Sequence, residues 1–441
     1  MKKILFFLVL VGALALGGSY FAGKKVQEEY NKFVSYVEKE LNLKVENKKY
    51  TSGLFESKGS FDLKISQADV LTKFGYEDTE PSGDELKLNL DTKISHSPLS
   101  FVSGFKSSTN VKVVNEDMQD TLKKAIGSNV IASVDMIATL DEKKDFKIKF
   151  ADVNFKEDGK NVKTQSINFE VLAAQNSIKS LKSSIKNINL DDSEFAAQIK
   201  NLSYDLEYKE PVSLNDFSYI KLFSYPYKND IKVDTFTIKE ADSIKFDDFK
   251  YSENASWADE AKGLMASDGE YSTKTLEING IKLKELLLKT SMKNMSMKSY
   301  EKLINATYSD DMELSISGLR EFFSFKPRFD ITKFSLKNES GNELNFSSNA
   351  FVEGDIAQNA DIFSILGTLR FDAKLHINTN FAEFFKGLEN AENIEASLLE
   401  MGVIKPDENK GFVSYMKFDP SKYMDIMIND KIGLISLILG Q

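Results

Sequence analysis

The dominant pattern along most of the chain is an alternation of apolar and polar residues. Apolar side chains occupy almost every second position in residues 86–94, 167–171 and 369–377. Alternate side chains of a β-strand point to the same face of its sheet. Each of these stretches is therefore predicted to be a strand with one buried face and one solvated face.

A second pattern places apolar residues at gaps of two, three and two. Its five copies begin at Ile148, Ile231, Ile244, Leu276 and Phe329. In a regular strand the gap of three would move the second apolar pair to the opposite face, but a β-bulge or sharp bend restores the phase. We therefore predict kinked strands that each keep one apolar face. The alternative is chance in a chain rich in Phe, Ile and Leu.

Helical patterns are fewer. Residues 23–41 place Val26, Tyr30, Val34 and Val37 on one stripe opposite a charged face, which predicts an amphipathic helix that docks on the rest of the chain. A coiled-coil seam between two copies is the alternative interpretation of the same stripe. Further helices are expected at Glu116–Ile126, Ser256–Ala266, Ser299–Tyr308 and Phe381–Met401.

Together these patterns predict a mostly β protein with some α (α+β), built from large bent antiparallel sheets with bulged strands. We expect an N-terminal segment at 1–25, a juxtamembrane helix at 26–45, a first β-rich region at 46–210 and a second at 211–441 with helical insertions. The boundary between the last two rests on residues 211–227, where the strand pattern is weakest.

The N-terminal segment is predicted to be one transmembrane helix. Its apolar run from Ile4 to Ala22 follows two lysines and would form a helix of about 28 Å, close to the roughly 30 Å hydrocarbon core of a bilayer. Cleavage of a signal peptide after Ala13-Leu14-Ala15 is the alternative, but it would leave part of the apolar run on the mature chain. The expected anchor residues include Ile4, Leu10, Leu16, Tyr20 and Phe21.

Nothing after the anchor predicts a second span, so we expect the body of the protein in the periplasm, held at the bacterial inner membrane. The formal charge of −10 falls to −14 without the four lysines that flank the anchor. Only three of the 57 basic residues are arginine, the residue that most often recognises phosphate. The acidic balance and the scarcity of arginine argue against a nucleic-acid partner.

The sequence offers little catalytic chemistry. It has no cysteine and only two histidines, which excludes disulfides and thiolate metal sites, and it indicates no catalytic residue, cofactor or metal ligand. His96 follows the apolar phase of strand 86–94, whereas His376 lies opposite Leu375 and Ile377 and is expected to face solvent. Met292, Met295 and Met297 form an adaptable apolar group, which we interpret as core packing or as the wall of a lipid-accepting groove.

Several motifs together resemble those of the YdgA-like proteins of Gram-negative bacteria. Residues 17–26 resemble the exit of their anchor. Tyr50, Gly53, Phe55 and Ser57 match their Tyr-x-x-Gly-Φ-Phe-x-Ser segment. His96 and Pro98 match a His-Gly-Pro signature in which Ser97 replaces the glycine, and residues 327–343 are similar to a late family segment.

The resemblance implies a single inner-membrane anchor, a periplasmic body and no assigned catalytic residue, because the family has no known function. We therefore interpret the motif positions as structural. The kinked strands are also similar in pattern to AsmA-like envelope proteins, whose curved sheets present an apolar groove.

Three functions fit these observations. The first is a non-enzymatic envelope protein that binds an apolar ligand such as lipid along a bent sheet. The second is a scaffold or assembly partner that acts as a homo-oligomer. The third is a hydrolase using His96, which is disfavoured because no nucleophile motif is present. A continuous apolar trough would favour the first function, and a closed, filled core would favour the second.

Overall fold

The chain is mostly β, as predicted: strands make up 63% and helices 18% of a computed structural model in which the sheet is large and antiparallel. The structure describes residues 26–39, 43–53, 56–66, 85–95, 105–139, 143–157, 159–174, 177–192, 194–213, 223–240, 242–308, 312–357, 359–408, 410–420 and 425–433. The expected anchor lies outside these residues.

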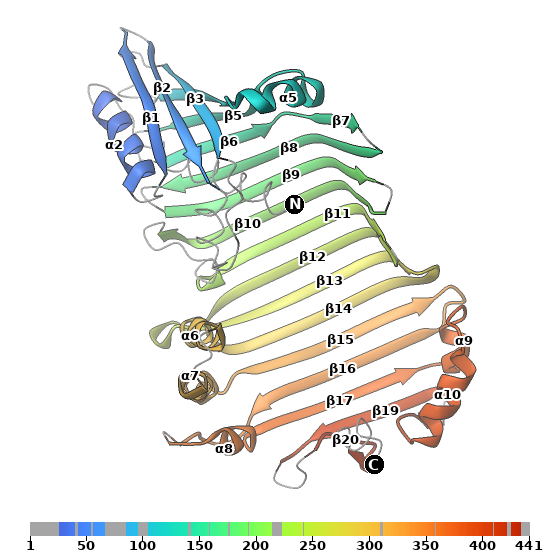
Figure 1. The fold of residues 1–441 in the computed structure, drawn as a ribbon. Helices are drawn as coiled ribbons and strands as arrows, with labels where there is room; N and C mark the ends of the chain where they lie inside the picture. The colour runs from blue at the N-terminus through green and yellow to red at the C-terminus, as the bar shows by residue number, and fades with distance from the viewer. Residues whose placement is uncertain are drawn as a thin grey trace. The chain divides into compact units, whose positions relative to one another are not determined.

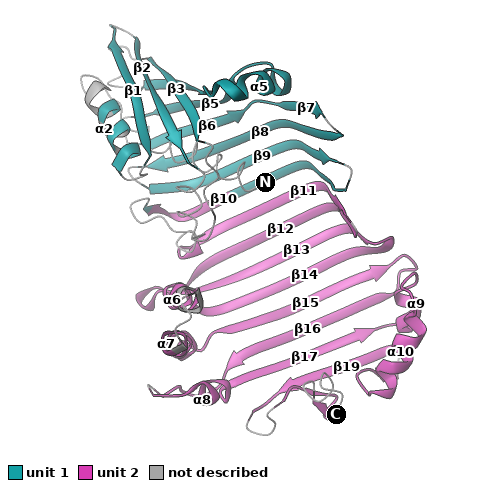
Figure 2. Cartoon of the chain, in the orientation of Figure 1, with its two compact units in different colours: residues 1–205, 213–215 teal, residues 206–212, 216–441 magenta. Residues whose placement is uncertain are grey.

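The chain forms two compact units (Figure 2). Unit 1 comprises residues 1–205 and 213–215, and unit 2 comprises residues 206–212 and 216–441. The division falls within strand β10 (Ala196–Ser213), the strand that also contains the expected boundary at residue 210. Pro211, at the start of the stretch with the weakest strand pattern, therefore lies in a strand.

Unit 1 is an antiparallel meander with helices packed on it. Its strands are β1 (Lys44–Ser52), β2 (Glu56–Ile65), β3 (Leu86–Ser95), β4 (Phe105–Val113), β5 (Val130–Ala138), β6 (Lys143–Phe150), β7 (Val153–Glu157), β8 (Lys160–Ala174) and β9 (Ser177–Asp191). The 3-10 turn η2 (Glu116–Met118) and helix α5 (Gln119–Ile126) join β4 to β5, as the pattern at 116–126 predicted. In Figure 1, β1–β3 are turned steeply relative to β6–β9, so the sheet of unit 1 curls.

Helix α2 (Val26–Lys39) completes the core of unit 1. Tyr30, Val34 and Val37 on its apolar stripe are at most 2% exposed, and Leu63 and Leu88 of the sheet are fully buried. Because the chain itself buries these helix side chains, they are not available as a coiled-coil seam. The structure thus supports the docking interpretation of the stripe.

Unit 2 is a second antiparallel meander of longer strands. These are β11 (Tyr227–Lys239), β12 (Ser243–Asp259), β13 (Leu264–Ile278), β14 (Ile281–Ser296), β15 (Arg328–Asn338), β16 (Glu343–Val352), β17 (Leu369–Ile377) and β19 (Phe412–Phe418), with short strands β18 (Lys405–Pro406), β20 (Met427–Ile428) and β21 (Ile432–Gly433). Strands β11 to β17 pair in chain order, and β17 then pairs with β19.

The helices of unit 2 lie at the two ends of its strands (Figure 1). Helices α6 (Met297–Tyr308), α7 (Met312–Ser324) and α8 (Ile362–Leu366) lie at one end. Helices α9 (Phe381–Phe384) and α10 (Ala391–Glu400) lie at the other. The prediction of a helix at 299–308 is confirmed by α6.

The two-three-two pattern marks real bends at several of its copies. In β15 the register shifts between Ile331 and Phe334. In the first copy, β6 ends at Phe150 and β7 begins at Val153. In β12 the bend contains Asp248, whose φ of 55° is left-handed. The copy at 276–283 is instead a hairpin, because Asn279 and Gly280 have φ values of 50° and 84°, as a type I′ turn requires.

Two helix predictions are wrong. Residues 256–266 contain the end of β12, the 3-10 turn η4 (Glu260–Lys262) and the start of β13, because the Asp259 carboxylate accepts the Lys262 N–H and Gly263 adopts a φ of 65°. Residues 381–401 form two helices and not one, since Gly387 has a φ of 106°, a conformation that breaks a helix.

Candidate functional site

The described motif residues of the sequence analysis lie at the hairpin of β1 and β2 in unit 1. The Tyr50 ring packs against the Tyr30 ring of α2 at 5.2 Å between centroids. A Cβ atom at Gly53 would overlap the carbonyl oxygen of Glu56, and Ser57 is 1% exposed. These residues pack the hairpin against α2.

Gly59, which the sequence analysis did not single out, belongs to the same packing site. A Cβ atom at Gly59 would overlap the Tyr30 ring, which also packs edge-on against Phe61 at 6.3 Å. Burial raises the pKa of the Tyr30 hydroxyl above its ordinary value of 10. The sequence did not indicate that Gly59 contacts Tyr30, because the two residues lie far apart along the chain.

The other motif residues, Phe55, His96 and Pro98, lie outside the described residues, as do the anchor residues Ile4, Leu10, Leu16, Tyr20 and Phe21. None of the helices within the described ranges is long and apolar enough to cross a membrane. His376 is half-buried and not freely solvated, because its Nε2 lies 3.1 Å from the Asp407 carboxylate.

Unit 2 offers a different kind of surface, because its sheet has one apolar and one polar face. A single cross-strand row on the apolar face contains Ile231, Tyr251, Tyr271, Leu288, Phe334, Phe346 and Leu375. The corresponding row on the other face contains Lys232, Lys250, Ser272, Leu287, Ser335 and Asn345. We refer to the first side as the apolar face.

The apolar face is only partly covered. All seven residues of the row are half-buried, in contrast to the fully buried side chains of unit 1. Other large side chains of this face, Ile244, Ile278 and Phe329, are 36%, 40% and 41% exposed. An apolar surface that is neither a filled core nor a set of scattered side chains is typical of a binding site.

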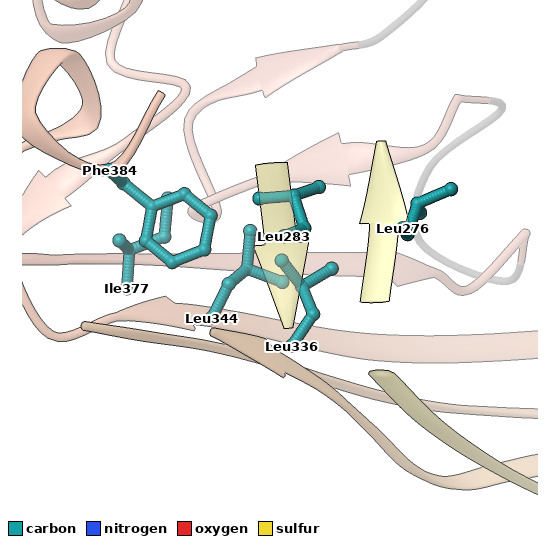
Figure 3. Close-up of a cluster of buried hydrophobic side chains, with 6 residues drawn as sticks. All are labelled: Leu276, Leu283, Leu336, Leu344, Ile377 and Phe384. Atoms are coloured by element: carbon teal, nitrogen blue, oxygen red, sulfur yellow. The ribbon is translucent and has the colours of Figure 1, made fainter. Parts of the chain in front are cut away.

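The ends of the strands are partly covered on this face. At one end, Phe384 of α9 packs into a cluster with five aliphatic side chains from β13 to β17 (Figure 3). These are Leu276, Leu283, Leu336, Leu344 and Ile377. The row of seven half-buried side chains lies between this cluster and the opposite end of the strands.

At the opposite end lies a cavity of about 270 Å³, here called the methionine cavity. Met292, Met295 and Met297 line it, together with Phe223, Tyr227, Ala255, Met265, Ala266, Ser267 and Tyr300. The three methionines are half-buried. They form part of an apolar cavity wall, which is the geometry that the second interpretation of this group required.

A polar group interrupts the apolar face next to this cavity. Glu253 is 8% exposed, and its carboxylate accepts hydrogen bonds from the hydroxyl groups of Tyr227, at 2.8 Å, and Tyr251. Burial and the hydrogen bond to Glu253 raise the pKa of Tyr251. The alternation of Tyr251, Glu253 and Ala255 was the available signal that Glu253 shares the apolar face.

The polar face of unit 2 contains a hollow of about 630 Å³, and several charges at or beside it form ion pairs. Lys289 lies 2.9 Å from Glu270, and Lys228 lies 2.8 Å from Asp230. Within the described residues, no cluster of three or more His, Asp or Glu side chains could hold a metal ion. The apolar face is thus the stronger candidate for a binding surface.

Comparison with known proteins identifies a family. Residues 1–385 match the model of a bacterial protein family of unknown function, DUF945. The chain belongs to the DUF945 family. No curated protein and no solved structure matches it.

The DUF945 match contains nearly all of the candidate site. It ends at residue 385, directly after Phe384 of α9, and includes strands β11 to β17 and the methionine cavity. Helix α10 and strands β18 to β21 follow the matched part. The apolar face of unit 2 therefore lies almost entirely within the part of the chain that matches the family model.

Proposed function

We propose that this DUF945 protein is a non-enzymatic protein of the bacterial cell envelope that binds the hydrocarbon part of a lipid on the apolar face of unit 2. The observation that carries the proposal is the row of seven large apolar side chains, all half-buried, across β11 to β17. Covering such a row contributes roughly 25 cal/mol for each Å² of apolar surface removed from water.

The cellular setting is part of the same proposal. The apolar run at 4–22 would anchor the chain in the inner membrane, and the YdgA-like motifs favour a body in the periplasm. An envelope protein in that place would meet lipid in its ordinary surroundings. No catalytic residue is assigned in this proposal.

Photo-crosslinking of the full chain in living cells tests the proposal. A benzophenone amino acid replaces Phe334 on the apolar face, and the same amino acid replaces Lys333, its exposed neighbour on the polar face. Irradiation followed by mass spectrometry should give lipid adducts at position 334 and few at position 333. Equal labelling at the two positions, or no lipid adduct at position 334, would refute lipid binding on this face.

A second candidate function, assembly with a partner or a second copy, has one observation in its favour. The short helix α8 exposes Ile362, Phe363 and Leu366 by 38%, 69% and 41%. Replacing Phe363 by Asp and measuring the molar mass of the full chain by light scattering tests this function. Loss of a dimer would support it, and a mass that the substitution does not change would count against it.

A further inference from the structure

The carboxylate of Glu253 lacks a compensating positive charge. It is almost completely buried on the apolar face, and its hydrogen-bond partners are two neutral tyrosine hydroxyls. Among the residues that the structure describes, no lysine or arginine forms an ion pair with it. A buried carboxylate with neutral partners alone is costly unless a cation or a proton joins it.

Asn229 adds a second acceptor beside this carboxylate. Asn229 and Glu253 are direct cross-strand partners of β11 and β12, so their Cβ atoms lie about 5 Å apart. Asn229 is 5% exposed, and its buried Oδ1 atom has no hydrogen-bond partner among the described residues. A buried amide oxygen and a buried carboxylate therefore lie side by side.

Small side chains continue the cross-strand row beside this pair. The row continues from Glu253 to Gly269 and then to Thr290. Gly269 contributes no side chain, and a Cβ atom there would lie 2.8 Å from the Thr290 hydroxyl oxygen. Along this cross-strand row, the residue next to Glu253 is therefore a glycine.

Aromatic rings and apolar rows flank the pair on both sides. Tyr227, two residues before Asn229, lines the methionine cavity. On the other side, the rings of Tyr251 and Tyr271 stack with 4.4 Å between their centroids. The pair consequently lies between an apolar cavity and the open row of the apolar face, within about 7 Å of each along the strands.

We propose that Glu253 and Asn229 bind the ammonium group of a cationic amphiphile whose hydrocarbon chain lies on the flanking apolar surface. An ammonium group carries donors and no acceptor, which complements two adjacent acceptors. Its charge neutralises the buried carboxylate, and tyrosine rings attract cations through their faces. This inference rests on the proposed function and names the chemical class of its ligand.

The test compares three probes with the same chain length, dodecylammonium, dodecanol and dodecanoate, each below its micelle concentration. Native mass spectrometry of the full chain measures the bound fraction. Dodecylammonium should bind about tenfold or more tightly than dodecanol, since a hydrogen bond to a charged group is worth about 1.5–3 kcal/mol. Glu253→Gln should remove this preference and leave dodecanol binding unchanged.

Glu270→Gln is the matched control, because Glu270 is an exposed carboxylate on the polar face beside Lys289. The control should retain the preference for dodecylammonium. If both substitutions abolish the preference, the cation is attracted by general surface charge and the assignment to Glu253 is wrong.

Asn229→Leu provides a second variant that leaves the carboxylate intact. It should weaken dodecylammonium binding by about threefold or more, and unchanged binding would remove Asn229 from the site. Thermal unfolding of each variant verifies that it is folded.

The remaining outcomes separate this inference from the proposed function. If all three probes bind equally well to the wild type and to Glu253→Gln, the result supports apolar binding on this face. It refutes the proposal that Glu253 and Asn229 bind an ammonium group. If none of the probes binds, both the proposed function and this inference are overturned.

Discussion

In unit 1, Gly59 lies directly against the Tyr30 ring. Because a Cβ atom at Gly59 would overlap the Tyr30 ring, we expect Gly59→Ala to reduce the free energy of unfolding by about 1–3 kcal/mol. Ser60→Ala, at the next and half-buried position, should have little effect. A lower thermal midpoint for Gly59→Ala alone, by circular dichroism, is the expected result.

A double substitution identifies the cause. If the overlap with the ring is responsible, Tyr30→Leu should cost less stability in the Gly59→Ala background than in the wild type. Strictly additive effects would mean that the glycine is required for another reason.

The raised pKa of Tyr251 predicts that the free energy of unfolding falls at alkaline pH. Its pKa in the folded chain lies above the ordinary value of 10 because of burial and its hydrogen bond to Glu253. The folded chain therefore keeps a proton that the unfolded chain loses, and the free energy of unfolding falls as the pH rises above about 10. Tyr251→Phe should reduce this loss in part, since the raised pKa of Tyr30 acts in the same direction.

Urea unfolding at pH 8 and pH 11 measures this effect. The difference between the two midpoints should be smaller in Tyr251→Phe than in the wild type. Tyr415→Phe, at a position that is 47% exposed, should keep the wild-type difference. An equal difference in all three proteins would exclude a contribution from Tyr251.

Single residues also show the reach and the limit of sequence reasoning at the candidate site. The burial of Val34 and Val37 followed from helical spacing alone. The methionines near 292–297 stood out as one group, but their cavity depends on Phe223 and Tyr227, which are distant in the chain. The pairing of Asn229 with Glu253 requires the register of β11 and β12, and sequence periodicity does not specify which residues face each other across two strands.

At the level of strands, the bend between β6 and β7 involves the neighbouring strand β8. Ser166 of β8 has a left-handed φ of 51°, and its N–H donates to the Asp152 carboxylate at 2.7 Å. Glycine adopts this conformation without the steric cost that other L-residues incur. We therefore expect Ser166→Gly to raise the free energy of unfolding by up to about 1 kcal/mol.

The control is Lys163→Gly in the same strand, where φ is not positive and the side chain is exposed. There glycine should lower stability by about 0.5–1 kcal/mol. Ser166→Val should also be destabilising, because a β-branched residue disfavours positive φ. Thermal midpoints of the three variants test whether the backbone at Ser166 is strained. A fall in stability for Ser166→Gly would contradict this explanation.

The spacing of apolar residues correctly located strands, but it did not show how consecutive strands and helices are connected. Alternation at 86–94 and 369–377 located β3 and β17, because a half-buried strand leaves a local signature. The same two-three-two spacing arose from a bulge in β15 and from the Asn279-Gly280 turn, since both insert residues between apolar pairs. At 381–401 the helical stripe was real, but the left-handed Gly387 divided it.

The two units bury their apolar residues in different ways, and this difference predicts where a ligand acts. Unit 1 has a filled core that includes Leu63, Leu88 and Ile94, none of which is exposed at all. In unit 2 the row through Leu288 and Phe334 remains half-buried. The partly buried row of unit 2 is therefore where a ligand would cover apolar surface.

A bound amphiphile should consequently stabilise unit 2 and leave unit 1 unchanged. A ligand that binds only the folded state adds about 2.7 kcal/mol at one hundred times its dissociation constant. Hydrogen exchange of the full chain with dodecylammonium should therefore slow in β12 to β15 and not in β2 to β4. Phe334→Asp, which places a charge on the apolar face, should abolish this protection while β2 to β4 exchange as before. Protection confined to unit 1, or spread equally over both units, would place the binding surface elsewhere.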